Sequence, residues 1–247
     1  MQRVTQGLLL LISISLCNSV FAKQSQKVEI NKLTDGVWVH VSEHTLSNGK
    51  TYPSNGLIIQ DGKTLTLVDT PWDAPKTQIL MKQIQQQINL PITKAVVTHF
   101  HYDRTGGADV LKTAGIPVYG HPLTKPLALK ENNPTPDHLL QKLGTINTKV
   151  TLGNMQLMYP GAAHAEDNIV VWLPEHKILY GGCAVRAAEA KTMGNTADGN
   201  LVSWQHAMDH LMQAFADIKV VVPGHGNSGT KKLITHTQQL LKTRLSK

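Results

Sequence analysis

The chain has 247 residues, of which 41% are hydrophobic and 17% charged, and its formal net charge is +7. It is long enough to bury a sizeable core and contains no linker, low-complexity run or short repeat, so its composition excludes a disordered or repeat protein and fits one globular domain. Its lysines are scattered and no basic run is interleaved with aromatic residues, which argues against nucleic-acid binding and leaves small anionic substrates as the better match.

The first 22 residues have the pattern of an export signal. Arg3 is followed by the apolar stretch 8–14, and Val20 and Ala22 occupy the positions where signal peptidase prefers small or β-branched residues. The apolar stretch is too short to remain as a membrane helix. We therefore expect a cleaved signal peptide over residues 1–22, a mature domain over residues 23–247, a periplasmic location and no stable membrane anchor.

The two cysteines bear on this expectation. A lipoprotein signal would also carry a cysteine near Cys17, but Leu16 stands where such signals usually have Gly, Ala or Ser. If Cys17 is removed with the signal, Cys183 is the only thiol of the mature chain and no intramolecular disulfide can form. A lone exported cysteine is either inert and buried or a ligand, and the glycines before Cys183 favour a ligand.

The pattern along the chain predicts strands before helices. Residues 28–69 contain apolar runs typical of strands and hairpins, with Asn48-Gly49 as a turn signal. Residues 75–88 are predicted to form a helix, since Leu80, Ile84 and Ile88 lie on one stripe. Two later helices are predicted around residues 204–215 and 233–241, and their Met, Leu and aromatic stripes are interpreted as core contacts.

A metal-binding pattern follows the short apolar run 95–97. Residues 98–107 read THFHYDRTGG and place His99, His101 and Asp103 at alternate positions. The two histidines project to one side because side chains alternate in an extended chain, and Asp103 lies one step farther along. The spacing predicts a loop at a strand end that serves two adjacent ions.

Three further ligand candidates are found by the same rule, as a His or Cys that borders a hydrophobic strand. His164 precedes such a strand, whereas Cys183 and His225 each follow one. Glycines beside Cys183 and His225 let the backbone approach a site closely. No alternative strand-end cluster competes with these three.

Ligand chemistry sorts the candidates into two zinc sites with three protein ligands each. The first set is His99, His101 and His164, and the second is Asp103, Cys183 and His225. Structural zinc normally has four protein ligands, whereas three leave a position for water, so the inventory favours catalysis. Thiolate and imidazole suit zinc better than magnesium or calcium.

Together these motifs resemble subclass B1 of the class B metallo-β-lactamases, from about residue 28 to the C-terminus. The wider superfamily shares the HxHxD loop, but glyoxalase II-like hydrolases and B3 enzymes usually have His where this chain has Arg104. B2 enzymes have Asn in place of His99, and glyoxalase II-like proteins use a bridging Asp in place of Cys183. The resemblance implies a mixed α/β fold, the four-layer αββα sandwich, with both metals where the sheets meet.

The resemblance also implies a function. A monomeric, periplasmic zinc β-lactamase would hydrolyse the β-lactam amide of penicillins, cephalosporins and also carbapenems, and so confer antibiotic resistance. Zinc lowers the pKa of bound water towards about 7, Asp103 would orient the nucleophile, and Asn195 would help polarise the lactam carbonyl. Two alternatives remain: a thioesterase or lactonase of the same fold, against which Arg104 and Cys183 argue, and a non-catalytic zinc protein.

Supporting roles follow from the same resemblance. Asp69 is expected behind the site, where a carboxylate orients the ligands, although it could instead cap the turn at Thr70. Arg104 is expected under the Asp103 zinc. Arg186 is expected to bind the substrate carboxylate, with a solvated surface position as the alternative. Residues 43–52 resemble a mobile hairpin that covers substrate.

The remaining histidines lack a strand-end setting with a partner at ligand spacing. His206 and His210 are four residues apart on a predicted helix, but the Glu of a helical zincin motif is absent. Surface or satisfied structural positions are expected for His40, His44, His121, His138, His176, His206, His210 and His236.

Overall fold

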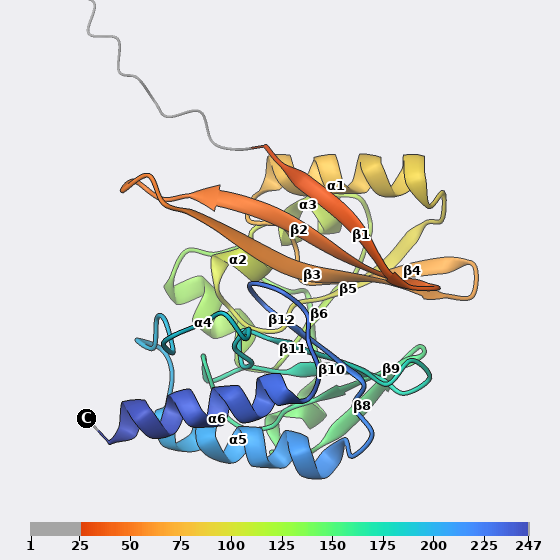
Figure 1. Cartoon of the computed structure of the whole chain (residues 1–247). Helices are drawn as coiled ribbons and strands as arrows, with labels where there is room; N and C mark the ends of the chain where they lie inside the picture. The colour runs from red at the N-terminus through yellow and green to blue at the C-terminus, as the bar shows by residue number, and fades with distance from the viewer. Residues whose placement is uncertain (1–25, 247) are drawn as a thin grey trace, which may run out of the picture.

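Two β-sheets form the centre of the computed structural model, which describes residues 26–246 (Figure 1). The expected signal peptide lies outside the described residues. The seven-stranded sheet contains, in spatial order, β1 (Val28–Thr34), β2 (Val37–Thr45), β3 (Thr51–Asp61), β4 (Thr64–Val68), β5 (Ile92–Val96), β6 (Val118–Gly120) and β7 (His138–Leu139). The five-stranded sheet contains β12 (Val220–Pro223), β11 (Ile178–Gly182), β10 (Val170–Leu173), β9 (Met155–Met158) and β8 (Lys149–Leu152).

Helices cover both outer faces. The helical segments are α1 (Ala74–Gln87), α2 (Tyr102–Thr105), α3 (Ala108–Thr113), α4 (Thr124–Lys130), the short 3₁₀ helix Gln141–Gly144, α5 (Leu201–Ala214) and α6 (Lys232–Leu245). Figure 1 shows α1 and α3 above the seven-stranded sheet and the antiparallel pair α5 and α6 below the other. The layers therefore follow the order αββα, which confirms the predicted fold class.

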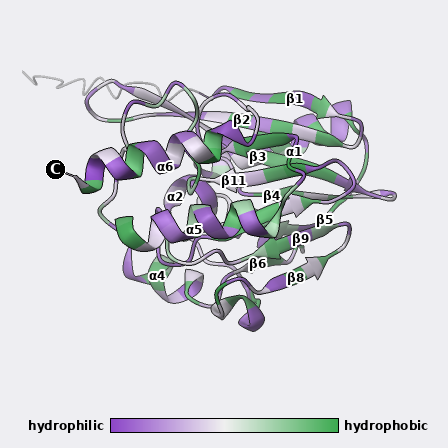
Figure 2. Ribbon diagram, turned by 60° about the horizontal axis from the view of Figure 1, so that its bottom comes forward, coloured by the Kyte–Doolittle hydropathy of each residue, from purple (hydrophilic) through white to green (hydrophobic). Residues whose placement is uncertain are grey.

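Side-chain alternation along the strands explains the layers. On β3, Leu57 and Ile59 point into the core between the sheets, whereas Ile58 points towards α1 and α3. On β10, Val171 faces the other sheet and Trp172 faces α5 and α6. These two inner strands are thus apolar on both faces, as sheets covered on both sides require, whereas the helices carry hydrophilic as well as hydrophobic residues (Figure 2).

The predicted local elements are present. Helix α1 begins at Ala74, because the Asp73 side chain caps it by accepting a hydrogen bond from the Lys76 amide at 2.9 Å. The segment 43–52 is a hairpin between β2 and β3, closed by a 2.9 Å hydrogen bond from the Leu46 amide to the Lys50 carbonyl. Within residues 26–246, no helix has the length and apolar character needed to cross a bilayer.

Topology brings the candidate ligands to one edge. The loop with His99 and His101 follows β5, and Cys183 and His225 follow the parallel neighbours β11 and β12. Parallel strands end at the same edge of a sheet, so two segments more than forty residues apart meet there. His164 reaches this edge from the other direction, because its loop leads into β10.

Burial of His121, at the end of β6, should make the stability of the protein pH-dependent. Its side chain is 1% exposed, and burial lowers its pKa to about 4 against an opposing hydrogen bond with the Leu143 backbone. In the unfolded chain the pKa returns to about 6.5. Between these values only the unfolded chain binds this proton, so stability is lost as pH falls through the window, by up to about 1.4 kcal/mol per pH unit.

His121→Asn should reduce this loss of stability, because the Asn side chain does not titrate. Its amide oxygen can still accept the hydrogen bond that the Leu123 amide donates to His121 Nδ1 at 3.1 Å. The free energy of unfolding of metal-free protein, measured in urea across the window, should fall less steeply with decreasing pH than in the wild type. Above pH 7 the variant and the wild type should show the same slope of unfolding free energy against pH. Equal slopes between about pH 4 and 6.5 would contradict the prediction.

Candidate metal centre

Three imidazoles converge on one point at the edge of the sheets. His99 Nε2 lies 3.1 Å from His101 Nδ1, which lies 3.0 Å from His164 Nε2. Tetrahedral ligands at about 2.0–2.1 Å from zinc are separated by roughly 3.3 Å, so the spacing is close to that of a zinc site. The structure therefore brings the first predicted ligand set together, and these three residues can hold one ion.

A carboxylate fixes the tautomer of one of these rings. His101 Nε2 lies 2.9 Å from Asp198 Oδ2, so its proton is donated there and Nδ1 presents a lone pair to the other two histidines. The sequence analysis missed Asp198. It lies in an irregular loop far from His101 along the chain, and no spacing rule connects the two.

Burial keeps two of these imidazoles, those of His99 and His164, uncharged. Desolvation, and then the neighbouring His101 and His164, hold the pKa of His99 well below its usual value. Burial, and then His101, lower the pKa of His164 to about 3. Within the described residues the buried Nδ1 of His164 has no hydrogen-bond partner. Neutral imidazoles whose lone pairs face one another suit a divalent cation, so the donor set fits zinc.

The second predicted set also comes together. Asp103 Oδ2 lies 3.1 Å from His225 Nε2 and 3.9 Å from Cys183 Sγ. Burial opposes ionisation of Asp103, but Arg104 and then His225 hold its pKa well below the usual value. Burial likewise disfavours charged His225, yet the neighbouring Cys183 and then the hydrogen bond with Asp103 raise its pKa to about 10. A carboxylate, a thiol and an imidazole can hold a second ion here.

Glycine is required for this approach at position 224. A Cβ atom there would lie 2.7 Å from Cys183 Sγ and 2.7 Å from the Cys183 backbone nitrogen. Gly182 has φ of +52°, a conformation that favours glycine. The glycines that flank both ligands in the sequence therefore have the predicted function.

Arg104 lies beneath the second set and is fully buried. Its Nη2 donates to Asp103 Oδ2 at 2.6 Å and to the Gly224 carbonyl at 3.0 Å. Its Nη1 donates to the Asn55 carbonyl at 2.6 Å and to the Tyr180 hydroxyl at 3.0 Å. Arg104 therefore contacts the candidate ligand Asp103, and its guanidinium holds segments that bear two candidate ligands.

Asp69 and Tyr180 complete the layer behind the ligands. Asp69 accepts hydrogen bonds from the Thr98 amide at 2.7 Å, the Thr98 hydroxyl at 2.9 Å and the Tyr180 hydroxyl at 2.7 Å. It does not cap Thr70, whose amide donates to the Arg104 carbonyl. Asp69 therefore orients the residue before His99. The sequence analysis missed Tyr180, which appears in the sequence only as one more apolar strand residue.

The two expected substrate contacts lie next to each other along one loop. The guanidinium of Arg186 packs against Gly194, where a Cβ atom would be 3.2 Å from Nη2, and Asn195 follows. Burial lowers the pKa of Arg186 against an opposing contribution from Cys183. Within residues 26–246, Arg186 forms no ion pair and its buried Nε has no partner. Asn195 is exposed, and its Oδ1 accepts from the Ala197 amide at 3.1 Å, which leaves the amide NH₂ free to donate.

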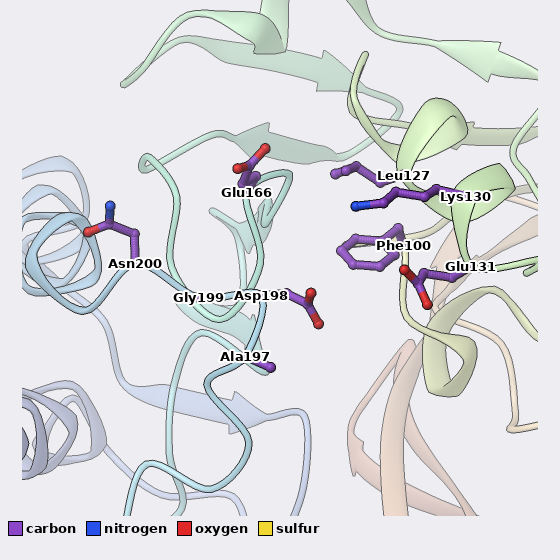
Figure 3. Close-up of a pocket in the computed structure, with 9 residues that line it drawn as sticks. All are labelled: Phe100, Leu127, Lys130, Glu131, Glu166, Ala197, Asp198, Gly199 and Asn200. Carbon is purple, nitrogen blue, oxygen red and sulfur yellow. The ribbon is translucent and has the colours of Figure 1, made fainter.

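Aromatic contacts and a pocket border the two clusters. His44 of the β2–β3 hairpin stacks on Trp72 with ring centroids 4.9 Å apart, and Trp72 lies 6.4 Å from the His225 ring. The hairpin thus reaches the second cluster. On the other side, a pocket of about 300 Å³ adjoins the His101 loop (Figure 3) and is lined by Phe100, Leu127, Lys130, Glu131, Glu166, Ala197, Asp198, Gly199 and Asn200.

None of the eight other histidines joins either candidate ligand set among the described residues. His40 and His121 are buried, although surface positions were one of the two expectations for them. His40 Nε2 lies 3.1 Å from the Asp69 carbonyl oxygen, which makes it a structural histidine behind the site. His206 and His210 border a shallow groove without a third ligand.

Comparison with known proteins places this geometry in a family. Residues 49–225 match the model of the metallo-β-lactamase superfamily. The chain belongs to this superfamily. It is 40% identical over 225 residues to a protein named metallo-β-lactamase type 2 of Bacillus sp. (strain 170), a match that covers 90% of this chain and 86% of that protein.

Solved structures agree with the family match. A metallo-β-lactamase from Pontibacter korlensis has a TM-score of 0.80 and 38% identity, over 87% of this chain and 99% of that one. The metallo-β-lactamase FIM-1 from Pseudomonas aeruginosa, in its mono-zinc form, has a TM-score of 0.84 and 34% identity, over 89% and 99%. The resemblance to class B metallo-β-lactamases is confirmed, and with it zinc as the metal that the two ligand sets could bind.

Cys183→Ser should empty one site and spare the other. A neutral hydroxyl replaces a sulfur ligand, so the Asp103 and His225 set should lose affinity for its ion, whereas the three-histidine set keeps all of its ligands. Zinc per chain after dialysis should fall from two to one, with an unchanged circular dichroism spectrum and with reduced hydrolysis. A mutant that keeps two zinc ions and full turnover would remove Cys183 from the ligands.

Proposed function

We propose that the mature chain is a zinc-dependent β-lactamase that acts in the periplasm. The observation that carries the proposal is the pair of adjacent three-ligand clusters, because each set leaves a coordination position for water or substrate. His99, His101 and His164 would hold one zinc, and Asp103, Cys183 and His225 the other. When bound, zinc supplies the Lewis acidity that makes water a nucleophile near pH 7 and polarises a carbonyl.

The residues of the chain perform the remaining tasks. The carboxylate of Asp103, in the second cluster, stays charged because Arg104 keeps its pKa low. This carboxylate can orient the attacking water. Asp198 accepts the Nε2 proton of His101 and so keeps the Nδ1 lone pair directed at the first site. Asp69 and Tyr180 keep Arg104 and Thr98 in place.

Substrate recognition is assigned to the loop that follows β11. The buried guanidinium of Arg186 has an unpaired Nε and is suited to a carboxylate, which would pair with it by charge-assisted hydrogen bonds. The amide nitrogen of Asn195 would donate to the lactam carbonyl as charge develops on its oxygen. Bicyclic β-lactams carry both groups, so penicillins, cephalosporins and carbapenems are proposed as substrates of the monomer.

Hydrolysis assays test this function directly. The purified protein should hydrolyse one penicillin, one cephalosporin and one carbapenem, measured as the loss of ultraviolet absorbance of each drug. A chelator should abolish this activity, and added zinc should restore it. A thioester and a lactone serve as comparison substrates, and faster turnover of either would favour the alternative hydrolase. Intact mass of protein from the periplasmic fraction should correspond to a chain that begins near Lys23.

Arg186→Ala should weaken binding of these drugs without loss of zinc. Removing a charge-assisted pair costs about 1–3 kcal/mol, roughly five- to a hundredfold in kcat/KM, and the effect should fall mainly on KM. Steady-state kinetics with a penicillin and a carbapenem measure it. Lys63→Ala, which removes an exposed cation far along the chain from the site, is the control. Equal kcat/KM for Arg186→Ala and wild type would exclude Arg186 from recognition.

A further inference from the structure

Asp167 is a buried carboxylate to which the mechanism above gives no part. It is fully inaccessible to solvent, and it lies three residues after His164 in the loop that leads into β10. Its Oδ2 accepts a hydrogen bond from the hydroxyl of Thr124, the first residue of α4, at 2.7 Å. Its Oδ1 has no hydrogen-bond partner among the described residues. Such a group is costly to bury and requires an explanation.

The surroundings of Asp167 connect it to the metal loops. Burial raises its pKa to about 7, and the hydrogen bond from Thr124 opposes that rise. Phe100 stands between His99 and His101. The main chain of Phe100 is held by Asn133, which follows α4 and donates from Nδ2 to the Phe100 carbonyl at 3.0 Å.

Further contacts lock the same three segments together. The Ile169 amide donates to the Thr98 carbonyl at 2.9 Å, so the loop after His164 is bonded to the residue before His99. Phe100, Ala128 and Ala165 form a small hydrophobic cluster between the His101 loop, α4 and the His164 loop. Figure 3 shows the Phe100 ring at the side of the pocket formed by α4, with the Asp198 loop opposite.

We propose that Asp167 is a positioning residue for the three-histidine site, which it serves by tying α4 to the loop of His164, while Asn133, just after α4, ties that helix to the Phe100 backbone. The inference rests on the proposed metal function, because it assigns Asp167 to one of the two zinc sites. Together with the hydrogen bond between Ile169 and Thr98, this bridge sets the distance between the pair His99 and His101 on one loop and His164 on another. No comparable bridge leads from Asp167 to Cys183 or His225 in the described structure.

The proposal predicts an effect confined to one site. Loss of the bridge lets the two loops separate, so the three imidazoles no longer meet at the spacing of one ion. Partners behind metal ligands typically contribute tenfold to a hundredfold to metal affinity. The second set does not depend on Asp167, because Arg104 holds Asp103 and Gly224 independently. A residue with a merely structural role would instead lower stability and affect both sites alike.

Asp167→Asn is the main variant, since it keeps the shape of the side chain but replaces the charged acceptor of the Thr124 hydrogen bond with a weaker, neutral one and so weakens the bridge. Glu166→Gln is the matched control, because Glu166 is an exposed carboxylate in the same loop and one residue nearer to His164. Thr124→Val removes only the hydroxyl donor and remains informative if the Asp167 variant does not fold. Zinc affinities of both sites are measured by chelator competition, and cobalt substitution reports the second site through its thiolate charge-transfer band.

Asp167→Asn should lower zinc affinity at the three-histidine site by about tenfold or more, Thr124→Val should act in the same direction, and Glu166→Gln should leave it unchanged. The thiolate band at saturating cobalt should keep its wild-type intensity in all three. Wild-type affinity at both sites in Asp167→Asn, or equal losses at the two sites, would overturn the proposal. Failure of the wild type itself to bind two ions would overturn the proposed function instead.

Discussion

The buried guanidinium of Arg104 is the interaction on which the rest of the site depends. A fully buried cation is tolerated only when it is paired and hydrogen-bonded, because desolvation of a charge costs several kcal/mol. Arg104 meets this condition with Asp103, the Tyr180 hydroxyl and the backbone carbonyls of Asn55 and Gly224 on other segments. Those partners belong to both sheets. Satisfying one charge therefore fixes the relative position of the two halves of the sandwich at their common edge.

The hydrogen bonds of Arg104 also set the geometry of the second ligand set. Asp103 lies in α2, which follows β5 of the seven-stranded sheet, and Cys183 and His225 follow β11 and β12 of the five-stranded one. The sheets pack through apolar side chains, and such contacts do not set position to a fraction of an ångström. Arg104 adds directional bonds to Asp103 and to the Gly224 carbonyl, one residue before His225. The three-histidine set is assembled from different contacts, centred on Asp69, Asp198 and the Phe100 backbone.

The sequence predicted the main elements and both ligand sets because each carries a local signal, and the family resemblance supplied the order of the layers. Strand and helix periodicity marked the elements, and a His, Asp or Cys at a strand end beside glycine marked the ligands. Asp198, Tyr180 and Asp167 carried no such signal. Asp198 meets His101 across a long stretch of chain in an irregular loop, and Tyr180 differs from its strand neighbours only by a hydroxyl. Their roles arise from tertiary contacts, which no short-range pattern encodes.

Unsatisfied polar atoms accumulate at the same edge as the ligands. Of the twelve buried side-chain atoms without a partner in the described structure, five belong to Arg104, His164, Asp167, Asn168 and Arg186. Each lowers the stability of the metal-free protein, since a buried polar atom has given up water without a replacement. The apolar clusters of the layers offset this cost. A bound cation supplies a partner for the converging imidazoles and favours the negative charges near it, so metal binding stabilises the folded state and the ligand geometry together.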